Sequence, residues 1–166
     1  MDITLIMPDQ DSSWSRMHSS VLGFTRKYGG SRITRGAYRE VQKLTPAALR
    51  QPGCALFIAT VSTEDGSRLA GLSLMTGYGE QAGIVIVHPL YRGRHIGTRL
   101  LQAQQLQLGR LNCRVALDNP SSLKMCFNAG LTATRMIQGP TGKPTLVLEA
   151  GQQVYPHTDA AAVPQT

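Results

Sequence analysis

The hydrophobic pattern of the first half of the chain predicts a short strand, two helical stretches and three further strands. The strand covers residues 3–7, and the polar segment 11–13 can cap a helix whose apolar residues recur at helical spacing as far as Tyr28. A second helical stretch covers residues 35–49, with an interruption at Thr45-Pro46. Continuous apolar runs of strand length, separated by glycine-containing turns, then follow at 55–61, 69–75 and 83–87.

The second half of the chain alternates helices and strands. The pattern predicts a helix from Ile96 to about Gly109, a strand at 113–117, a helix that starts at Asn119-Pro120, and a final hairpin with strands at 131–137 and 145–148. Three hairpin-type strands followed by helical crossovers predict an α/β (α+β mixed) fold. We expect a central mixed, mostly antiparallel twisted sheet with helices on both faces, splayed between the strands at 83–87 and 113–117.

Length and composition indicate one globular domain. The chain has 166 residues, of which 42% are hydrophobic and 16% charged, so it can bury a core. We expect a single domain over residues 1–150 and a flexible C-terminal tail over residues 151–166. No apolar run approaches the ~18 residues of a membrane span, so no membrane partner is expected.

The net charge of +7 favours anionic ligands. The basic residues are spread from Arg16 to Lys143 without a dense run and with little aromatic interleaving, which disfavours a nucleic-acid partner. Three scattered cysteines and a start without a signal sequence predict reduced thiols and a cytoplasmic location. The four histidines are also scattered, so no metal is expected.

The chemistry is concentrated where the strand at 83–87 runs through a glycine- and arginine-rich turn into a helix. The free N–H groups and the macrodipole of a helix N-terminus bind anions, and Gly93 and Gly97 let a ligand approach the backbone. The segment is neither GxGxxG nor GxxxxGK[ST], which disfavours a dinucleotide site or a nucleoside triphosphatase. The alternative is an ordinary turn that uses Gly97 for tight packing.

Two segments resemble the Gcn5-related N-acetyltransferase (GNAT) superfamily. Residues 87–101 match its coenzyme-A signature, Gln/Arg-x-x-Gly-x-Gly/Ala, through Arg92 and Gly97, and residues 119–131 resemble its second conserved element. The sequence departs from the family at two positions. His95 replaces the central glycine, and Cys126 stands where a tyrosine commonly protonates the departing thiolate.

The resemblance implies a GNAT-like acyl-CoA N-acyltransferase fold and an acetyltransferase that uses acetyl-CoA as co-substrate. An amine of an unidentified small-molecule or peptide acceptor would attack the thioester directly in a ternary complex, with a backbone N–H near Val87 binding the carbonyl oxygen. The protein would be a monomer or a homodimer. The residues that the resemblance assigns to acetyl-CoA are Val85, Ile86, Val87, Arg92, Gly93, Arg94, His95, Ile96, Gly97, Thr98, Asn119 and Ser122.

The groups that transfer protons are less well defined by the sequence. Cys126 can act as the acid, or it can be a small buried residue that packs helix against sheet. Glu80 is a candidate base, and Asp118 and His88 are further candidates by their position near the loop. The strands at 83–87 and 113–117 carry no carboxylate. A non-catalytic acyl-CoA-binding or regulatory module of the same fold is therefore the alternative function.

Overall fold

The computed structural model describes residues 1–7 and 13–151. Its helices and strands follow the predicted order, with three short 3-10 helices (η) in addition. In chain order the elements are β1 (Asp2–Leu5), α1 (Ser13–Tyr28), η1 (Gly30–Arg32), α2 (Arg35–Gln42), α3 (Pro46–Leu49), β2 (Ala55–Thr63), β3 (Gly66–Thr76), η2 (Gly77–Gly79), β4 (Ala82–Val87), η3 (Pro89–Tyr91), α4 (Ile96–Leu108), β5 (Arg110–Ala116), α5 (Pro120–Asn128), β6 (Thr132–Gln138) and β7 (Pro144–Gly151).

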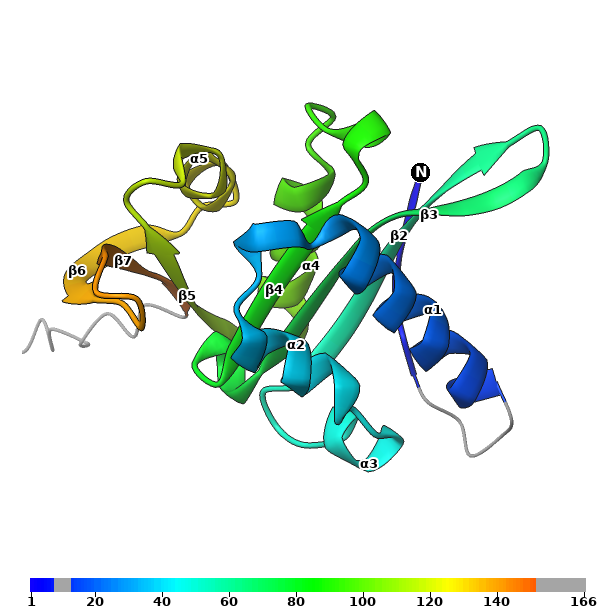
Figure 1. Cartoon of the computed structure of the whole chain (residues 1–166), viewed down its shortest axis with the longest axis horizontal. Coiled ribbons are helices and arrows are strands. Elements are labelled where there is room, and N and C mark those ends of the chain that lie inside the picture. The colour runs from blue at the N-terminus through cyan, green and yellow to red at the C-terminus, as the bar shows by residue number, and fades with distance from the viewer. Residues whose placement is uncertain (8–12, 152–166) are drawn as a thin grey trace, which may run out of the picture.

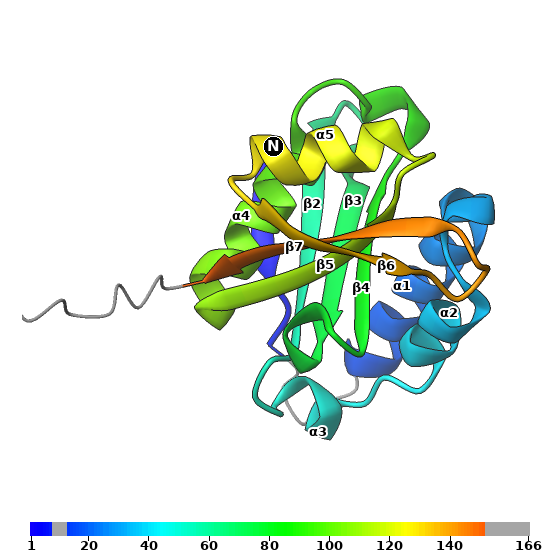
Figure 2. The same cartoon turned by 90° about the vertical axis from the view of Figure 1, so that its left-hand side faces the viewer.

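The strands form two antiparallel sheets. The first has the order β1-β2-β3-β4 and the second has the order β5-β7-β6. Figure 2 shows the second sheet crossing over the edge of the first at a steep angle. The expected fold class and the splay between 83–87 and 113–117 are confirmed. The sheet differs from the expectation in one respect, because no ladder joins β4 to β5 in the described residues and every pairing there is antiparallel.

Local sequence signals explain where the helices begin and end. Thr34 caps α2 by accepting a hydrogen bond from the Ala37 N–H at 3.1 Å, and Thr45 caps α3 in the same way. Asn119 caps α5, and Gly109 ends α4 in the left-handed conformation with φ 76°. The predicted caps at residues 11 and 12 lie outside the described residues. Of the tail predicted over residues 151–166, Gly151 is the last residue of β7, and the rest lies outside the described residues.

Helices cover both faces of the first sheet, and strand alternation determines which side chains they meet (Figure 1). On β2, Leu56 and Ile58 pack with the buried residues of α1 and α2. Phe57 and Ala59, one residue further along each time, pack with Ile96 and Leu100 of α4 on the opposite face. In the described part of the chain, no helix is both long and apolar enough to cross a membrane.

A buried glutamine ties α4 to the first sheet. Gln104 is completely buried, and its Nε2 donates to the carbonyl oxygens of Ala55 at 3.0 Å and Ser73 at 3.2 Å and to the Ser73 hydroxyl at 3.0 Å. These bonds join one helix to both β2 and β3. Buried polar groups that are hydrogen-bonded fix the relative position of the elements that carry them. The helix α4 is therefore held in a defined place on the first sheet.

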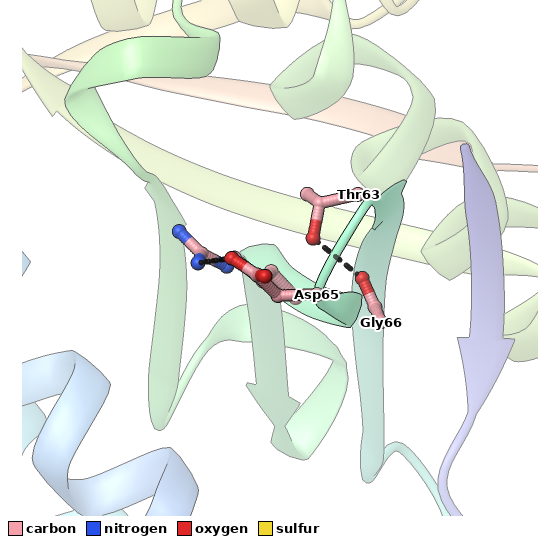
Figure 3. A network of polar contacts seen from close by, with 4 residues as sticks. Thr63, Asp65 and Gly66 are labelled. Carbon is pink, nitrogen blue, oxygen red and sulfur yellow. Dashed lines mark hydrogen bonds and ion pairs between the residues drawn. The ribbon is translucent and has the colours of Figure 1, made fainter.

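The hairpin between β2 and β3 is closed by polar contacts at the molecular surface (Figure 3). The Thr63 hydroxyl donates to the carbonyl oxygen of Gly66 at 2.7 Å. Asp65 accepts a hydrogen bond from Arg68 at 3.0 Å, and both side chains are exposed. Gly66 has φ 109°, a conformation that other residues rarely adopt. This turn therefore follows from its glycine and its local hydrogen bonds.

Candidate active site

A cavity of about 650 Å³ lies where the two sheets separate. Besides Met75 of β3, its walls come from six segments: the connection from α1 to α2, the strand β4, the loop that follows β4, the start of α4, the strand β5, and the helix α5. Both strands present an edge to this cavity, because β4 pairs with β3 alone and β5 pairs with β7 alone in the described residues. The separation of the sheets thus creates the space.

The backbone of β4 turns hydrogen-bonding groups toward the cavity. The N–H of His88, just after the strand, donates to the Ala70 carbonyl of β3 at 2.8 Å. Bonding direction alternates along an antiparallel strand, so the peptide groups of Val85 and Val87 point to the free edge. Arg92 uses one of them, since its Nε donates to the Val87 carbonyl oxygen at 3.3 Å. The Val87 N–H is left facing the cavity.

The start of α4 supplies further donors. The first helical hydrogen bond of α4 runs from the Arg99 N–H to the His95 carbonyl at 3.0 Å, so the N–H groups of Ile96, Gly97 and Thr98 have no acceptor within the helix. His95, at the N-cap, gives no side-chain hydrogen bond, and the first turn contains no acidic residue. The residues that line the cavity here are His95, Ile96, Gly97 and Thr98. Uncapped donors at a helix N-terminus fit the pyrophosphate of coenzyme A.

Two backbone positions give the loop its shape. Gly93 has φ 77°, and His95 has φ 60° and ψ 19°. Both values lie in the left-handed region, which costs a residue with a side chain roughly 1–2 kcal/mol. The glycine of the GNAT signature that His95 replaces therefore corresponds to a left-handed position in this loop. A histidine occupies it here under strain.

Gly97 allows α5 to lie close to α4. A Cβ atom at this position would collide with the Sδ atom of Met125 and would lie 3.6 Å from Cγ1 of Val85. Met125 and Val85 both line the cavity. The glycine therefore keeps the Met125 side chain out of the space between β4 and the loop.

A pair of thiols lies in the wall formed by β5 and α5. Cys113 and Cys126 both line the cavity and belong to one core cluster, and Cys126 is only 2% exposed. Hydrogen bonding with the Cys126 thiol, and then burial, raises the pKa of Cys113 far above its ordinary value. The same hydrogen bond lowers the pKa of Cys126, although burial opposes it.

The sequence matches no protein-family model, and no curated protein matches it. Solved structures resemble it in their backbones. A chimera of the Vibrio cholerae spermidine N-acetyltransferase SpeG with hSSAT superposes with a TM-score of 0.64 at 12% identity, covering 92% of this chain and 96% of that one. AAC(6')-Ib in complex with ribostamycin and coenzyme A superposes with a TM-score of 0.61 at 16% identity, covering 98% and 100%. The chain has the GNAT fold.

Within this GNAT fold the cavity collects nearly all residues that the sequence suggested for the cofactor. Only Arg94 is missing from the lining; its guanidinium lies 5.6 Å from the centre of the Tyr91 ring. Those that line the cavity are Val85, Ile86, Val87, Arg92, Gly93, His95, Ile96, Gly97, Thr98, Asn119 and Ser122.

The suggested acid lines the cavity of the GNAT fold, and the suggested bases do not. Cys126 is part of the wall. Glu80 is exposed at the opposite end of β4 from the loop, where it borders a different hollow together with Glu149. Asp118 forms an ion pair with Lys143 at 2.7 Å, and the next residue, Asn119, caps α5.

His88, the third suggested base, holds the loop rather than facing the cavity. Its Nδ1 accepts a hydrogen bond from the Leu90 N–H at 3.1 Å, and its ring centre lies 4.4 Å from that of Tyr28. The centre of the Tyr91 ring lies 5.4 Å from the centre of the same imidazole ring. His88 therefore contacts both α1 and the start of the loop that follows β4.

One side of the cavity was not predicted from the sequence. Tyr28, Arg32, Ile33, Thr34 and Ala37 line it from the α1–α2 connection. They form no motif, and only the folded chain brings them opposite β5. Arg114 and Lys124 also line the cavity. Arg114 carried a usable signal, because it is a lone charge within the apolar strand 113–117.

Proposed function

We propose that the protein is an acetyl-CoA-dependent N-acetyltransferase. The observation that supports this most directly is the cavity that joins the free edge of β4 to the uncapped donors of α4. An extended ligand arm can pair with β4 while a diphosphate group rests on the N–H groups of Ile96, Gly97 and Thr98. The GNAT fold of the chain, shared with structures of N-acetyltransferases holding coenzyme A, agrees with this assignment.

In this proposal the backbone of the chain provides most of the cofactor site. Arg92 and Lys124 add positive charge where the phosphates would lie. The Val87 N–H points from the edge of β4 toward the position of the thioester carbonyl oxygen, where a fixed donor stabilises developing negative charge. Bound acetyl-CoA supplies the activated acetyl group. Gly97 keeps the side chain of Met125 clear of the space between β4 and the loop that follows it.

Proton transfer in this site does not depend on a carboxylate of the described lining. No Asp or Glu lines the cavity among residues 1–7 and 13–151. The acceptor amine therefore arrives neutral or loses its proton to water. We assign Cys126 a packing role, because it is 2% exposed and a thiolate of ordinary pKa leaves without help. The free thiols of the described chain also fit the cytoplasmic location that we propose.

One observation favours a second candidate function. A cavity without a carboxylate also fits a module that binds acyl-CoA and transfers nothing. The two functions share the cofactor site and differ only in turnover. Binding of acetyl-CoA alone therefore does not separate them.

Two measurements on the full chain test the proposal. Acetyl-CoA should raise the melting temperature, because a ligand of the native state stabilises it. Amines of several classes should then release the coenzyme-A thiol, followed with a thiol reagent, and the acetylated amine should appear in the mass spectrum. A melting temperature that acetyl-CoA leaves unchanged refutes the cofactor site. A shift without thiol release from any amine selects the binding module.

A further inference from the structure

The cationic residues of the cavity lie at two places. Arg92, in the loop after β4, and Lys124, on α5, lie on the side of the uncapped donors of α4. Arg32, in η1, and Arg114, on β5, line the cavity from other elements than that loop and α5. The first pair serves the phosphates in the proposed function. The second pair has no role there.

Strand alternation fixes the side to which Arg114 points. Cys113 and Val115, its neighbours on β5, are buried in the core cluster that also holds Cys126 of α5. Successive side chains of a strand point to opposite faces, so Arg114 projects away from α5. The connection between α1 and α2, which contains Arg32, also lines the cavity. The two arginines therefore line the cavity from elements that the proposed cofactor site does not use.

Neither arginine is neutralised by the described part of the protein. The ion pairs there are Arg68 with Asp65 and Lys143 with Asp118. Both arginines are exposed, and neither guanidinium group forms a hydrogen bond with another described residue. Thr34, which also lines the cavity, caps α2, so the positive end of that helix dipole adds to the same potential.

The acidic residues of the described ranges lie elsewhere. Of the ten in the sequence, seven are in the described ranges and three, at 9, 11 and 159, are outside them. None of the seven lines the cavity. They lie on β1 (Asp2), on α2 (Glu40), in the β2–β3 turn (Glu64 and Asp65), after η2 (Glu80), before α5 (Asp118) and on β7 (Glu149).

We propose that the acceptor is a small amine that also carries a carboxylate or a phosphate, and that Arg32 and Arg114 bind this anionic group. The inference rests on the proposed acetyl transfer and specifies its substrate class. Charge-assisted hydrogen bonds from arginine to a carboxylate or phosphate are strong and directional. A polycation in the same place meets two guanidinium groups and no carboxylate from the described part of the chain. Spermidine and aminoglycosides, which the names of the structural neighbours mention, are therefore poor acceptors here.

The charges of Arg32 and Arg114 also favour deprotonation of the acceptor amine, for which the described cavity lining offers no carboxylate base. Positive neighbours disfavour a second positive charge, so they lower the pKa of an acceptor ammonium group held beside them. The anionic group of the acceptor pairs with the arginines and fixes the amine near the Val87 N–H. The site thereby selects an anionic acceptor and holds more of its amine in the neutral, nucleophilic form.

The test compares matched acceptors in the thiol-release assay. Free α-amino acids and aminoalkyl phosphates are the anionic probes, and the corresponding amino acid amides and aminoalcohols lack the anion. Spermidine and kanamycin are the polycationic probes. The best anionic probe should exceed its uncharged counterpart in kcat/KM by about 10- to 100-fold, the worth of a charge-assisted hydrogen bond. Comparison of the amino acids with the aminoalkyl phosphates shows whether the anionic group of the acceptor is a carboxylate or a phosphate. A polycation that exceeds every anionic probe overturns the proposal.

Arginine variants then locate the preference. Arg114→Gln and Arg32→Gln should each lower kcat/KM for the anionic probe at least 10-fold, and by a clearly larger factor than for the uncharged counterpart. Arg114→Glu should reverse the order of the two probes. Arg68→Gln removes the same charge from the exposed β2–β3 hairpin and should change neither rate. If Arg114→Gln instead weakens acetyl-CoA binding and leaves acceptor preference intact, the arginine binds the cofactor and the proposal fails.

A binding measurement separates this inference from the proposed function. With coenzyme A present, an N-acetyl amino acid, the product of the proposed reaction, should raise the melting temperature of the wild type but not of Arg114→Gln. The amide of the same N-acetyl amino acid should raise neither. Equal shifts with acid and amide overturn the anion site even if acetyl transfer occurs. Absence of any acetyl-CoA shift refutes the proposed function itself, and the inference falls with it.

Discussion

Replacing Gly97 gives the sharpest test of the cofactor site. A methyl group here would collide with Sδ of Met125 and would lie 3.4 Å from its Cγ. The α5 backbone is held by its own packing, so the side chain of Met125 has to move. It lines the cavity, and the open direction is therefore into the space proposed for the cofactor. Gly97→Ala should disturb ligand binding more than it disturbs folding.

The expected stability change is small. Glycine to alanine inside a helix gains about 1 kcal/mol, while overpacking costs typically about 1–3 kcal/mol. The free energy of unfolding of Gly97→Ala should therefore fall by no more than about 2 kcal/mol. Gly97→Leu should lose more stability and leave no room for the ligand.

The binding assay has a larger range. Acetyl-CoA at 100 times its dissociation constant stabilises the native state by about 2.7 kcal/mol, which is a melting-temperature rise of roughly 5–11 °C for a domain of this size. A 100-fold loss of affinity reduces that rise to about 1 °C at the same concentration. We expect such a loss for Gly97→Leu and at least a 10-fold loss for Gly97→Ala.

Two further variants control the interpretation. Gly23→Ala adds a methyl group on α1 with no atom within 4 Å, so it should gain about 0.5–1 kcal/mol and keep the full acetyl-CoA shift. Met125→Ala in the Gly97→Ala background removes the colliding atom and should restore much of the shift, as a double-mutant cycle can quantify. A folded Gly97→Leu variant that binds acetyl-CoA like the wild type would refute the assignment of the loop.

Three other predictions concern the cavity wall. Cys126→Ala should lose about 1–2 kcal/mol of stability and keep kcat within threefold; a ~100-fold loss of kcat in a folded variant would identify Cys126 as the acid. The ordinary thiol pKa is near 9.0, and the Cys113 pKa is raised, so the folded thiol pair keeps a proton that the unfolded chain loses above that pH. Stability should therefore fall by roughly 2 kcal/mol more between pH 9 and pH 11 than in the Cys113→Ala/Cys126→Ala variant, measured by urea unfolding; parallel curves would contradict the thiol hydrogen bond. His95→Gly should relieve left-handed strain and gain about 0.5 kcal/mol after the added entropy of the unfolded chain, with unchanged acetyl-CoA affinity. A tenfold weaker affinity in both His95→Gly and His95→Ala would show that the imidazole contacts the cofactor.

The order of helices and strands could be predicted from the sequence because the turns, caps and apolar runs that determine it are local. The strand at 83–87, the glycine-rich turn and the cap at Asn119 each act through neighbours in the chain, and the structure has them where the pattern put them. The sequence predicted one sheet with β4 and β5 splayed apart, whereas the structure has these strands in two separate sheets. The full extent of this separation depends on how the second sheet packs on α4 and α5, which no local pattern encodes.

The candidate site was predictable on one side only. The cofactor loop is a continuous segment with a motif, so its residues could be named in advance. Arg32 comes to the cavity from a connection with no regular pattern, and Arg114 faces it because of strand alternation on β5. Glu80 seemed close because it precedes β4 in the chain, yet a strand of six residues separates its ends by roughly 20 Å. Nearness in sequence placed it at the wrong end.

The unpaired edge of β4 has a consequence for hydrogen exchange. Peptide groups that point into the gap between the sheets have no partner strand in the described residues, so the Val85 and Val87 amides should exchange rapidly in the protein alone. The Ile84 and Ile86 amides, which face β3, should exchange slowly throughout. A ligand arm that pairs with β4 would protect the first two amides and leave the others unchanged. Two alternating pairs of amides within six residues thus provide a reporter of cofactor binding that carries its own control.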